Sequence, residues 1–286
     1  MNKLKSAEES QGAWNAIWHQ IKKSGLSNVI LSSESFERAE TQEHFDWLRE
    51  SFKDHDVKVI VYMREQSSRL ESTYVEQLKG GFWREYDTYV ENRLEFLDYS
   101  VKMAPWAEIF GHENIRVRPL EKDVSKDLLG DFLKSCDIYD TSGFEFTQNQ
   151  RTRTSLINLK LVYRMNREFR GGNWEKRGLS KYIKQSRLLK KVLDEFDEQH
   201  AEIEKYRFMP YADAMKVKDH FRESNRKVAK DYLNVDGDLF EYNTEPYEHV
   251  SLDIQPEDIE QVSDYAMFLL NKIAGSTGKE RRKLRT

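Results

Sequence analysis

The sequence contains a single cysteine, Cys136, among its 286 residues. No intrachain disulfide is therefore possible, and a metal cluster held by several cysteines is excluded, which favours a reducing compartment. No apolar run approaches the ~20 residues that a membrane-spanning helix requires. The first residues, 1–14, also lack the apolar stretch of a secretory signal peptide. These absences predict a cytoplasmic protein without a membrane span.

An excess of charge of one sign is also lacking. Lysine and arginine number 46 and aspartate and glutamate number 50, which gives a formal net charge of −4. This balance gives no indication of a nucleic-acid partner. The most basic run, KERRKL at 279–284, is typical of a solvated tail, although a basic tail can also contact nucleic acid or acidic lipid.

Familiar catalytic and metal-binding patterns are missing too. The 7 histidines are scattered without metal-ligand spacing, and the sequence has neither a Ser-His-Asp signature nor an HExxH motif. We therefore expect no metal cofactor. No pattern indicates an oligomeric state.

What is present is an alternation of apolar patterns in the first half of the chain. Runs of apolar residues predict strands at 27–33, 57–63 and 113–121, and helical spacing predicts helices between them. One of these helices covers 68–79, with Ser68 and Glu71 as a capping box. The alternation predicts an α/β fold with a parallel sheet covered on both faces, a three-layer core over 1–147. Helical periodicity follows from about residue 151, so 148–286 is expected to be a mainly helical extension packed on the core as one domain.

The turn after the strand 57–63 is the best candidate for a ligand site. Arg64 follows that strand directly, and open parallel sheets bind ligands beyond the carboxyl ends of their strands. The free N–H groups and dipole at the start of the next helix favour an anion. Ser72, about one turn inside that helix, adds a hydroxyl donor, and the Arg64 guanidinium offers a fork that matches phosphate oxygens. The pair predicts a phosphate clamp; the alternative is an ordinary surface arginine and an exposed serine.

Several blocks in the same order carry a resemblance to a known family: NVILSSESF, VYMREQSSRLESTYVEQLK, FGHENIRVRPLEK, NQRTRTSLINLKLVYRMNR and FRESNRKVAKDYLNVDGDLF. Over roughly residues 28–240 the chain resembles bacterial sulfotransferase-like proteins of the P-loop fold, which act on or beside cell-surface polysaccharide synthesis. The resemblance implies the nucleotide donor 3′-phosphoadenosine 5′-phosphosulfate, with Arg64 and Ser72 on its 3′-phosphate. It also implies that Glu34 is the base that takes the acceptor proton. Ser32 and Ser33 would then donate hydrogen bonds to the sulfate or nucleotide.

One element of that family is missing from the sequence. The loop that cradles the 5′-phosphosulfate, of the type Lys-x-Gly-Ser/Thr-Ser/Thr after a strand, is not found around any glycine. The nearest match, GSTGKE at 275–280, follows a helix and is interpreted as a helix stop with a flexible end. Two explanations remain open: the chain is a fragment that starts after the first β-loop-α unit, or it is a member that has lost donor chemistry.

Three functions follow from these patterns. The first is transfer of a sulfuryl group to a hydroxyl or amine of a carbohydrate or small-molecule acceptor, with residues 82–106 and the C-terminal helices lining the acceptor site. The second is a truncated or non-catalytic member that binds nucleotide, glycan or a partner protein. The third, a metal-dependent glycosyltransferase, is suggested only by Asp236-Gly237-Asp238, which has no strand before it.

Overall fold

The computed structural model describes residues 7–91, 93–145, 154–170, 191–199, 206–242 and 244–275. The chain divides into two compact units, Met1–Lys53 and Asp54–Thr286. The predicted boundary between residues 147 and 148 lies outside the described residues, as do the GSTGKE segment beyond residue 275 and the basic run 279–284. No described helix is long and apolar enough to cross a membrane.

The first unit is built from two helices joined by an irregular segment. Helix α1 spans Ala7–Ser24, a short 3₁₀ helix η1 spans Glu34–Arg38, and α2 spans Gln42–Phe52. Aromatic side chains on the helical stripes join α1 to α2, with the rings of Trp14 and Trp47 4.8 Å apart between centroids. Such pairs add stability beyond the apolar area that they bury.

The segment 27–33, predicted to be a strand, is irregular. Its two β-branched residues stay largely accessible, because Val29 is 46% and Ile30 is 51% exposed. A short apolar run forms a strand only where a neighbouring strand satisfies its backbone N–H and C=O groups, and this run has no such partner among the described residues.

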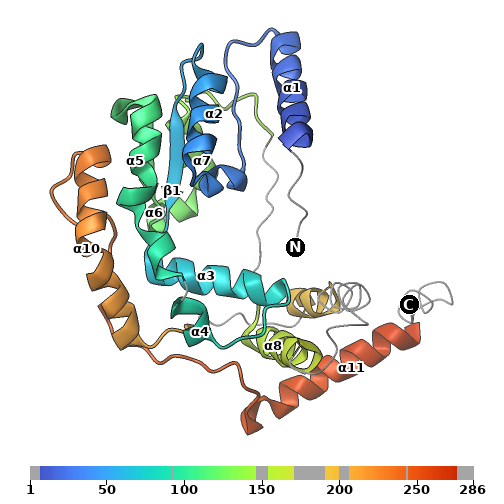
Figure 1. Cartoon of the computed structure of the whole chain (residues 1–286). Coiled ribbons are helices and arrows are strands. Elements are labelled where there is room, and N and C mark those ends of the chain that lie inside the picture. The colour runs from blue at the N-terminus through green and yellow to red at the C-terminus, as the bar shows by residue number, and fades with distance from the viewer. Residues whose placement is uncertain are drawn as a thin grey trace. The chain divides into compact units, whose positions relative to one another are not determined.

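The second unit contains a small parallel sheet surrounded by helices (Figure 1). Strand β1 (Val59–Met63) pairs with β2 (Ile115–Pro119), with Val59 opposite Ile115 and Met63 opposite Pro119. The helices and turns of this unit are α3 Gln66–Lys79, α4 Tyr86–Glu91, η2 Leu94–Leu97, α5 Tyr99–Phe110, η3 His112–Asn114, α6 Lys122–Lys126, α7 Leu128–Ser135, α8 Leu156–Arg170, α10 Tyr211–Leu233, η4 Pro256–Asp258 and α11 Ile259–Gly275. A further helical segment spans 191–199.

The fold class predicted from the sequence is wrong for the described part of the chain. Two strands form one sheet there, and helices make up most of the remaining structure, so the three-layer parallel sheet of the P-loop type is not present. The physical reason is that the segment 27–33, expected to add a strand to the sheet, is irregular, so β1 and β2 pair only with each other among the described residues. Helices pack on this small sheet. Helices α5 and α10 both contact β2, and Met103 and Val228 pack with the sheet residues Met63 and Val117.

A second and larger part of the core lies around α3. Leu70, Tyr74 and Leu78 form one stripe of that helix and are at most 2% exposed. They pack against residues of α4, α8 and α10, including Tyr89, Leu159 and Phe221. Helix α3 is therefore held from several sides, and its opposite face is free to line a cleft.

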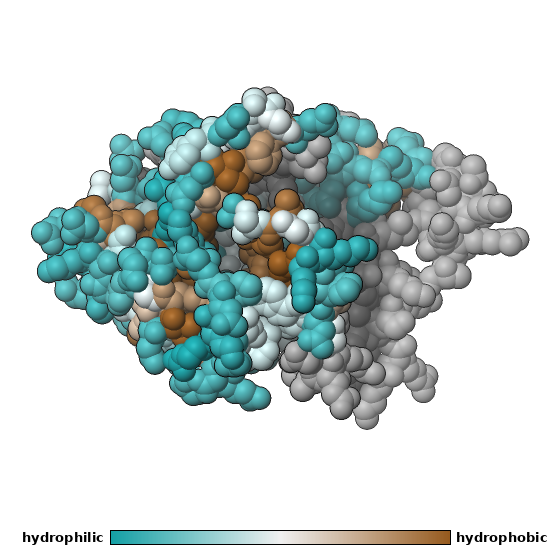
Figure 2. Space-filling model, turned by 90° about the horizontal axis from the view of Figure 1, so that it is seen from above, coloured by the Kyte–Doolittle hydropathy of each residue, from teal (hydrophilic) through white to brown (hydrophobic). Residues whose placement is uncertain are grey.

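The surface of the described residues is mostly hydrophilic in the view of Figure 2, where the hydrophobic residues form separate small patches. Exposed apolar side chains include Val101 on α5 at 66% and Leu270 on α11 at 57%. Single exposed apolar side chains are ordinary in soluble proteins, and they give no indication of a partner.

Candidate functional site

A cleft of about 1210 Å³ lies at the carboxyl ends of the two strands in the second unit. Arg64 and Glu65 follow β1, and Leu120 and Glu121 follow β2, and all four residues line it. The remaining walls come from α3, from the segments 194–198 and 206–218, and from Ser125, Thr154, Glu241, Tyr242 and Tyr247. The cleft is therefore placed where parallel strands usually present their ligands.

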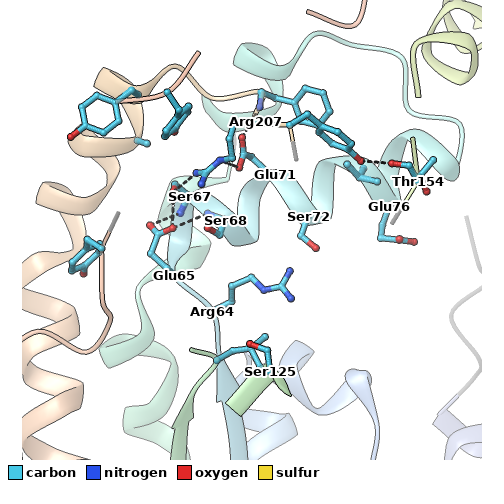
Figure 3. A pocket seen from close by; sticks show the side chains of 18 of the residues that line it. Arg64, Glu65, Ser67, Ser68, Glu71, Ser72, Glu76, Ser125, Thr154 and Arg207 are labelled. Atoms are coloured by element: carbon cyan, nitrogen blue, oxygen red, sulfur yellow. Dashed lines mark hydrogen bonds and ion pairs between the residues drawn. The ribbon is translucent and has the colours of Figure 1, made fainter. Parts of the chain in front are cut away.

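Arg64 and Ser72 both line this cleft, and their role in holding a phosphate stays a prediction. Figure 3 shows the Arg64 guanidinium and the Ser72 hydroxyl reaching into the same space beside α3. The Arg64 side chain is exposed, and within the described part of the chain it has no ion pair or hydrogen bond. Its backbone is fixed instead, because the Tyr99 hydroxyl donates to the Arg64 carbonyl over 2.5 Å. A guanidinium on a fixed backbone with open donors is well suited to an anion.

Two serines missed by the sequence reasoning extend this group. Ser68 lies one helical turn before Ser72 and faces the same cleft, since residues four apart share a helix face. Ser125, in α6, lines the cleft from the side of β2 and donates its hydroxyl hydrogen to the Glu121 carbonyl. The spacing of Ser68 and Ser72 could have revealed the first; nothing local to the sequence reveals the second.

The N-terminus of α3, whose free N–H groups were expected to bind an anion, starts and is capped differently from the prediction. The helix begins at Gln66, and the Glu65 carboxylate caps it by accepting from the N–H groups of Ser67 at 2.8 Å and Ser68 at 2.9 Å. The predicted capping box of Ser68 and Glu71 is therefore wrong, because the helix starts two residues before Ser68. The N–H groups expected to hold a phosphate are already paired with a carboxylate, so an anion here depends on side-chain donors.

Glu71 has a different role. It is 8% exposed and accepts hydrogen bonds from the backbone N–H groups of Phe208 at 2.6 Å and Met209 at 3.0 Å. It also forms an ion pair with Arg207, with 2.5 Å between Oε2 and Nε. Burial raises the pKa of Glu71 above its ordinary value, while Arg207 and the two N–H donors oppose that shift.

Acidic side chains outnumber basic ones around the cleft. The basic residues are Arg64, Lys79, Arg207 and Lys218, and the acidic ones are Glu65, Glu71, Glu76, Glu121, Asp194, Asp197, Glu198 and Glu241. Several carboxylates are occupied: Asp197, for example, accepts from the Ser155 hydroxyl at 2.7 Å and from the Asn158 amide at 2.8 Å. The summed charge of the side chains around the cleft does not favour an anion. Binding of an anion therefore depends on hydrogen bonds donated by the Arg64 guanidinium and the serine hydroxyls.

The other predicted site residues lie in the first unit. Ser33 caps η1 by accepting from the Ser35 N–H at 3.1 Å, and Glu34 is the first residue of that short helix. Ser32, Ser33 and Glu34 are exposed. The strand that was expected to carry them to the edge of the sheet is absent, so the role of Glu34 as a base stays a prediction without that geometric support.

Two further expectations concern the acceptor and a metal. No described residue from 82–106 lines the cleft; Tyr86 and Tyr89 lie instead in the core at 9% and 1% exposure. Asp238 accepts from the Arg226 guanidinium at 2.9 Å, and no group of metal-ligating side chains occurs among the described residues. Tyr86 and Tyr89 are buried because their rings pack on Tyr74 of α3.

No family model matches the chain, and no solved structure matches it. An uncharacterized protein of Archaeoglobus fulgidus is 24% identical over 207 residues, which cover 72% of this chain and 54% of that protein. The chain thus spans about half the length of the relative that it matches.

Proposed function

We propose that the chain is a sulfotransferase-like protein whose cleft binds 3′-phosphoadenosine 5′-phosphosulfate, or the product adenosine 3′,5′-bisphosphate, through Arg64 and Ser72. The observation that carries the proposal is their position: both side chains line one cleft at the carboxyl ends of both strands. The resemblance in sequence supplies the identity of the nucleotide, and the exposed Arg64 guanidinium supplies the chemistry of phosphate binding.

In the proposed reaction, the oxygen or nitrogen of an acceptor attacks the sulfur atom of the donor. A new S–O or S–N bond forms, the bond from sulfur to the bridging phosphate oxygen breaks, and adenosine 3′,5′-bisphosphate leaves. The proton of the acceptor passes to a base. Arg64 and Ser72 hold the 3′-phosphate throughout and thereby fix the position of the donor. The proposed acceptor is a hydroxyl or amine on a carbohydrate or small molecule.

A second candidate function is binding of the nucleotide, a glycan or a partner protein without transfer. The observation that favours it is the location of Glu34, which begins a 3₁₀ helix rather than ending a strand of the sheet. Incubation with donor carrying labelled sulfate separates the two functions. Label appearing on a mixture of carbohydrate and amine acceptors supports transfer, and its absence with intact nucleotide binding supports the second function.

Calorimetric titration with adenosine 3′,5′-bisphosphate tests the proposed binding. Arg64→Ala and Ser72→Ala are compared with Arg164→Ala, a control that removes an arginine whose side chain is 67% exposed on α8. Loss of a charge-assisted hydrogen bond costs about 1.5–3 kcal/mol, so Arg64→Ala is expected to weaken binding by about 10-fold to 150-fold. Ser72→Ala is expected to weaken it by about 2-fold to 10-fold. Equal affinity of the wild type and Arg64→Ala would remove the assigned role of Arg64.

A further inference from the structure

A second guanidinium lines the same cleft from another wall. Arg207 lies in the segment that leads into α10, and its neighbours hold it on several sides. Its Nε faces the Glu71 carboxylate at 2.5 Å, and its Nη2 donates to the Ser67 hydroxyl at 3.3 Å (Figure 3). The guanidinium also lies over the Tyr247 ring, 4.7 Å from the centroid. Arg207 therefore has a fixed orientation.

Glu71 is the residue that fixes it. The same carboxylate accepts from the backbone N–H groups of Phe208 and Met209, so it holds both the side chain of Arg207 and the chain that follows. Its side chain is 11% exposed and that of Arg207 is 28% exposed. A charged pair this far from water persists only with additional hydrogen bonds. Phe208 and Met209 supply these to Glu71. Ser67 accepts one from Arg207, whose Nε faces the carboxylate without a hydrogen bond among the described residues.

No hydrogen bond or ion pair is made by the Nη1 group of Arg207 among the described residues, whereas Nη2 donates to Ser67 and Nε faces Glu71. We propose that Arg207 binds a second anionic group of the ligand whose first phosphate is held by Arg64 and Ser72, and that Glu71 is the positioning residue for Arg207. This inference rests on the proposed function, because it needs a ligand with two anionic groups. Ser68 and Ser72 on α3 lie along the wall of the cleft that both arginines share.

The nearby Glu71 cancels much of the positive charge of Arg207. Recognition by Arg207 therefore depends on the direction of its N–H groups more than on attraction at a distance. A pre-oriented fork loses little conformational freedom on binding. Arg207 is thus expected to distinguish ligands with two anionic groups from those with one, while Arg64 contributes to both.

The test is calorimetry with two probes, adenosine 3′,5′-bisphosphate and adenosine 3′-monophosphate. Arg207→Gln is expected to weaken binding of the bisphosphate by about 10-fold or more and to leave binding of the monophosphate within about 2-fold of the wild type. Arg64→Ala is expected to weaken both. Arg222→Gln is the matched control, since Arg222 is an accessible arginine of α10 that pairs only with Asp219 among the described residues.

Two further variants separate a loss of binding from a loss of folding. Arg207→Gln alone leaves Glu71 buried without its cation, so Glu71→Gln/Arg207→Gln, which removes both charges, is measured beside it. Arg207→Lys keeps the charge but loses the fork, and it is expected to recover less than half of the lost selectivity. Bisphosphate binding unchanged in the Arg207 variants, or an equal loss for both probes, would overturn the inference. A wild type that binds neither probe would instead remove the proposed function itself.

Discussion

Replacing Asn225 by leucine is expected to destabilise the second unit markedly, although the two side chains have the same branched shape. Asn225 on α10 and Gln66 at the start of α3 are both 0% exposed. Their amides bond reciprocally, from Gln66 Nε2 to Asn225 Oδ1 over 2.7 Å and from Asn225 Nδ2 to Gln66 Oε1 over 3.1 Å. Asn225 also donates to the Tyr242 hydroxyl at 3.1 Å. The substitution removes all three bonds.

The size of the effect follows from what is left behind. A buried polar group without a partner costs about 1–3 kcal/mol. Gln66 keeps only a long contact of 3.5 Å to the Leu97 carbonyl, and water cannot reach a fully buried amide. The loss is therefore expected in the upper half of that range, about 2–3 kcal/mol.

Urea unfolding followed by far-UV circular dichroism measures this loss. With a slope of about 2–3 kcal/mol per molar, the midpoint is expected to fall by about 1 M. The control is Lys227→Leu, which removes only the exposed pair with Asp231 and is expected to change stability by less than about 1 kcal/mol.

A double-mutant cycle then isolates the pair. Gln66→Met together with Asn225→Leu replaces both amides by apolar groups of similar size, so the double variant is expected to lose less than the sum of the two single losses. The reasoning is refuted if Asn225→Leu behaves like the control, or if the two single losses simply add.

Three other predictions follow. Glu65→Ser keeps a good cap for α3 but removes a carboxylate beside Arg64. Repulsion between two like charges near 4 Å in water is about 1 kcal/mol, so the substitution should tighten binding of adenosine 3′,5′-bisphosphate about 5-fold by calorimetry. Weaker binding would contradict this. The hydrogen bond from Arg118 lowers the pKa of Asp131, so its stabilisation is present above the unfolded pKa and lost as pH falls through the folded one. The gap in melting temperature between wild type and Asp131→Asn should accordingly close between about pH 5 and pH 2. Leu78→Ala, at a position 0% exposed, should lower the free energy of unfolding by about 2–5 kcal/mol, and a loss below about 1 kcal/mol in urea would show that the site collapses freely.

The sequence predicted elements well where periodicity was long and unambiguous. The stripes of α3, α8, α10 and α11 and the apolar run of β1 all correspond to observed elements. It was wrong at 27–33, because a short apolar run fits a strand, a buried loop or an exposed one equally well. The choice among them depends on a neighbouring strand, which local pattern does not specify.

Some residues of the candidate site could likewise be predicted from a local sequence pattern, and others could not. Arg64 and Ser72 could be placed beside the same cleft from the sequence because both lie in one local strand-turn-helix pattern. The cap was misplaced because serine is a preferred N-cap residue and glutamate is not, so residue type favoured Ser68 over Glu65. Arg207 was missed because its partner, Glu71, is far from it along the chain, and no spacing rule connects them.

The contacts around α3 have a consequence for the order in which the molecule forms. Gln66 meets Asn225, and Glu71 meets Phe208, across separations of 159 and 137 residues. Contacts between such distant parts of a chain form late, because a large loop must close before they are made. During synthesis the strands and α3 leave the ribosome long before α10 does. The cleft thus acquires its second wall only near the end of folding, and a nascent chain that has not yet reached α10 is expected to be unable to hold a ligand there.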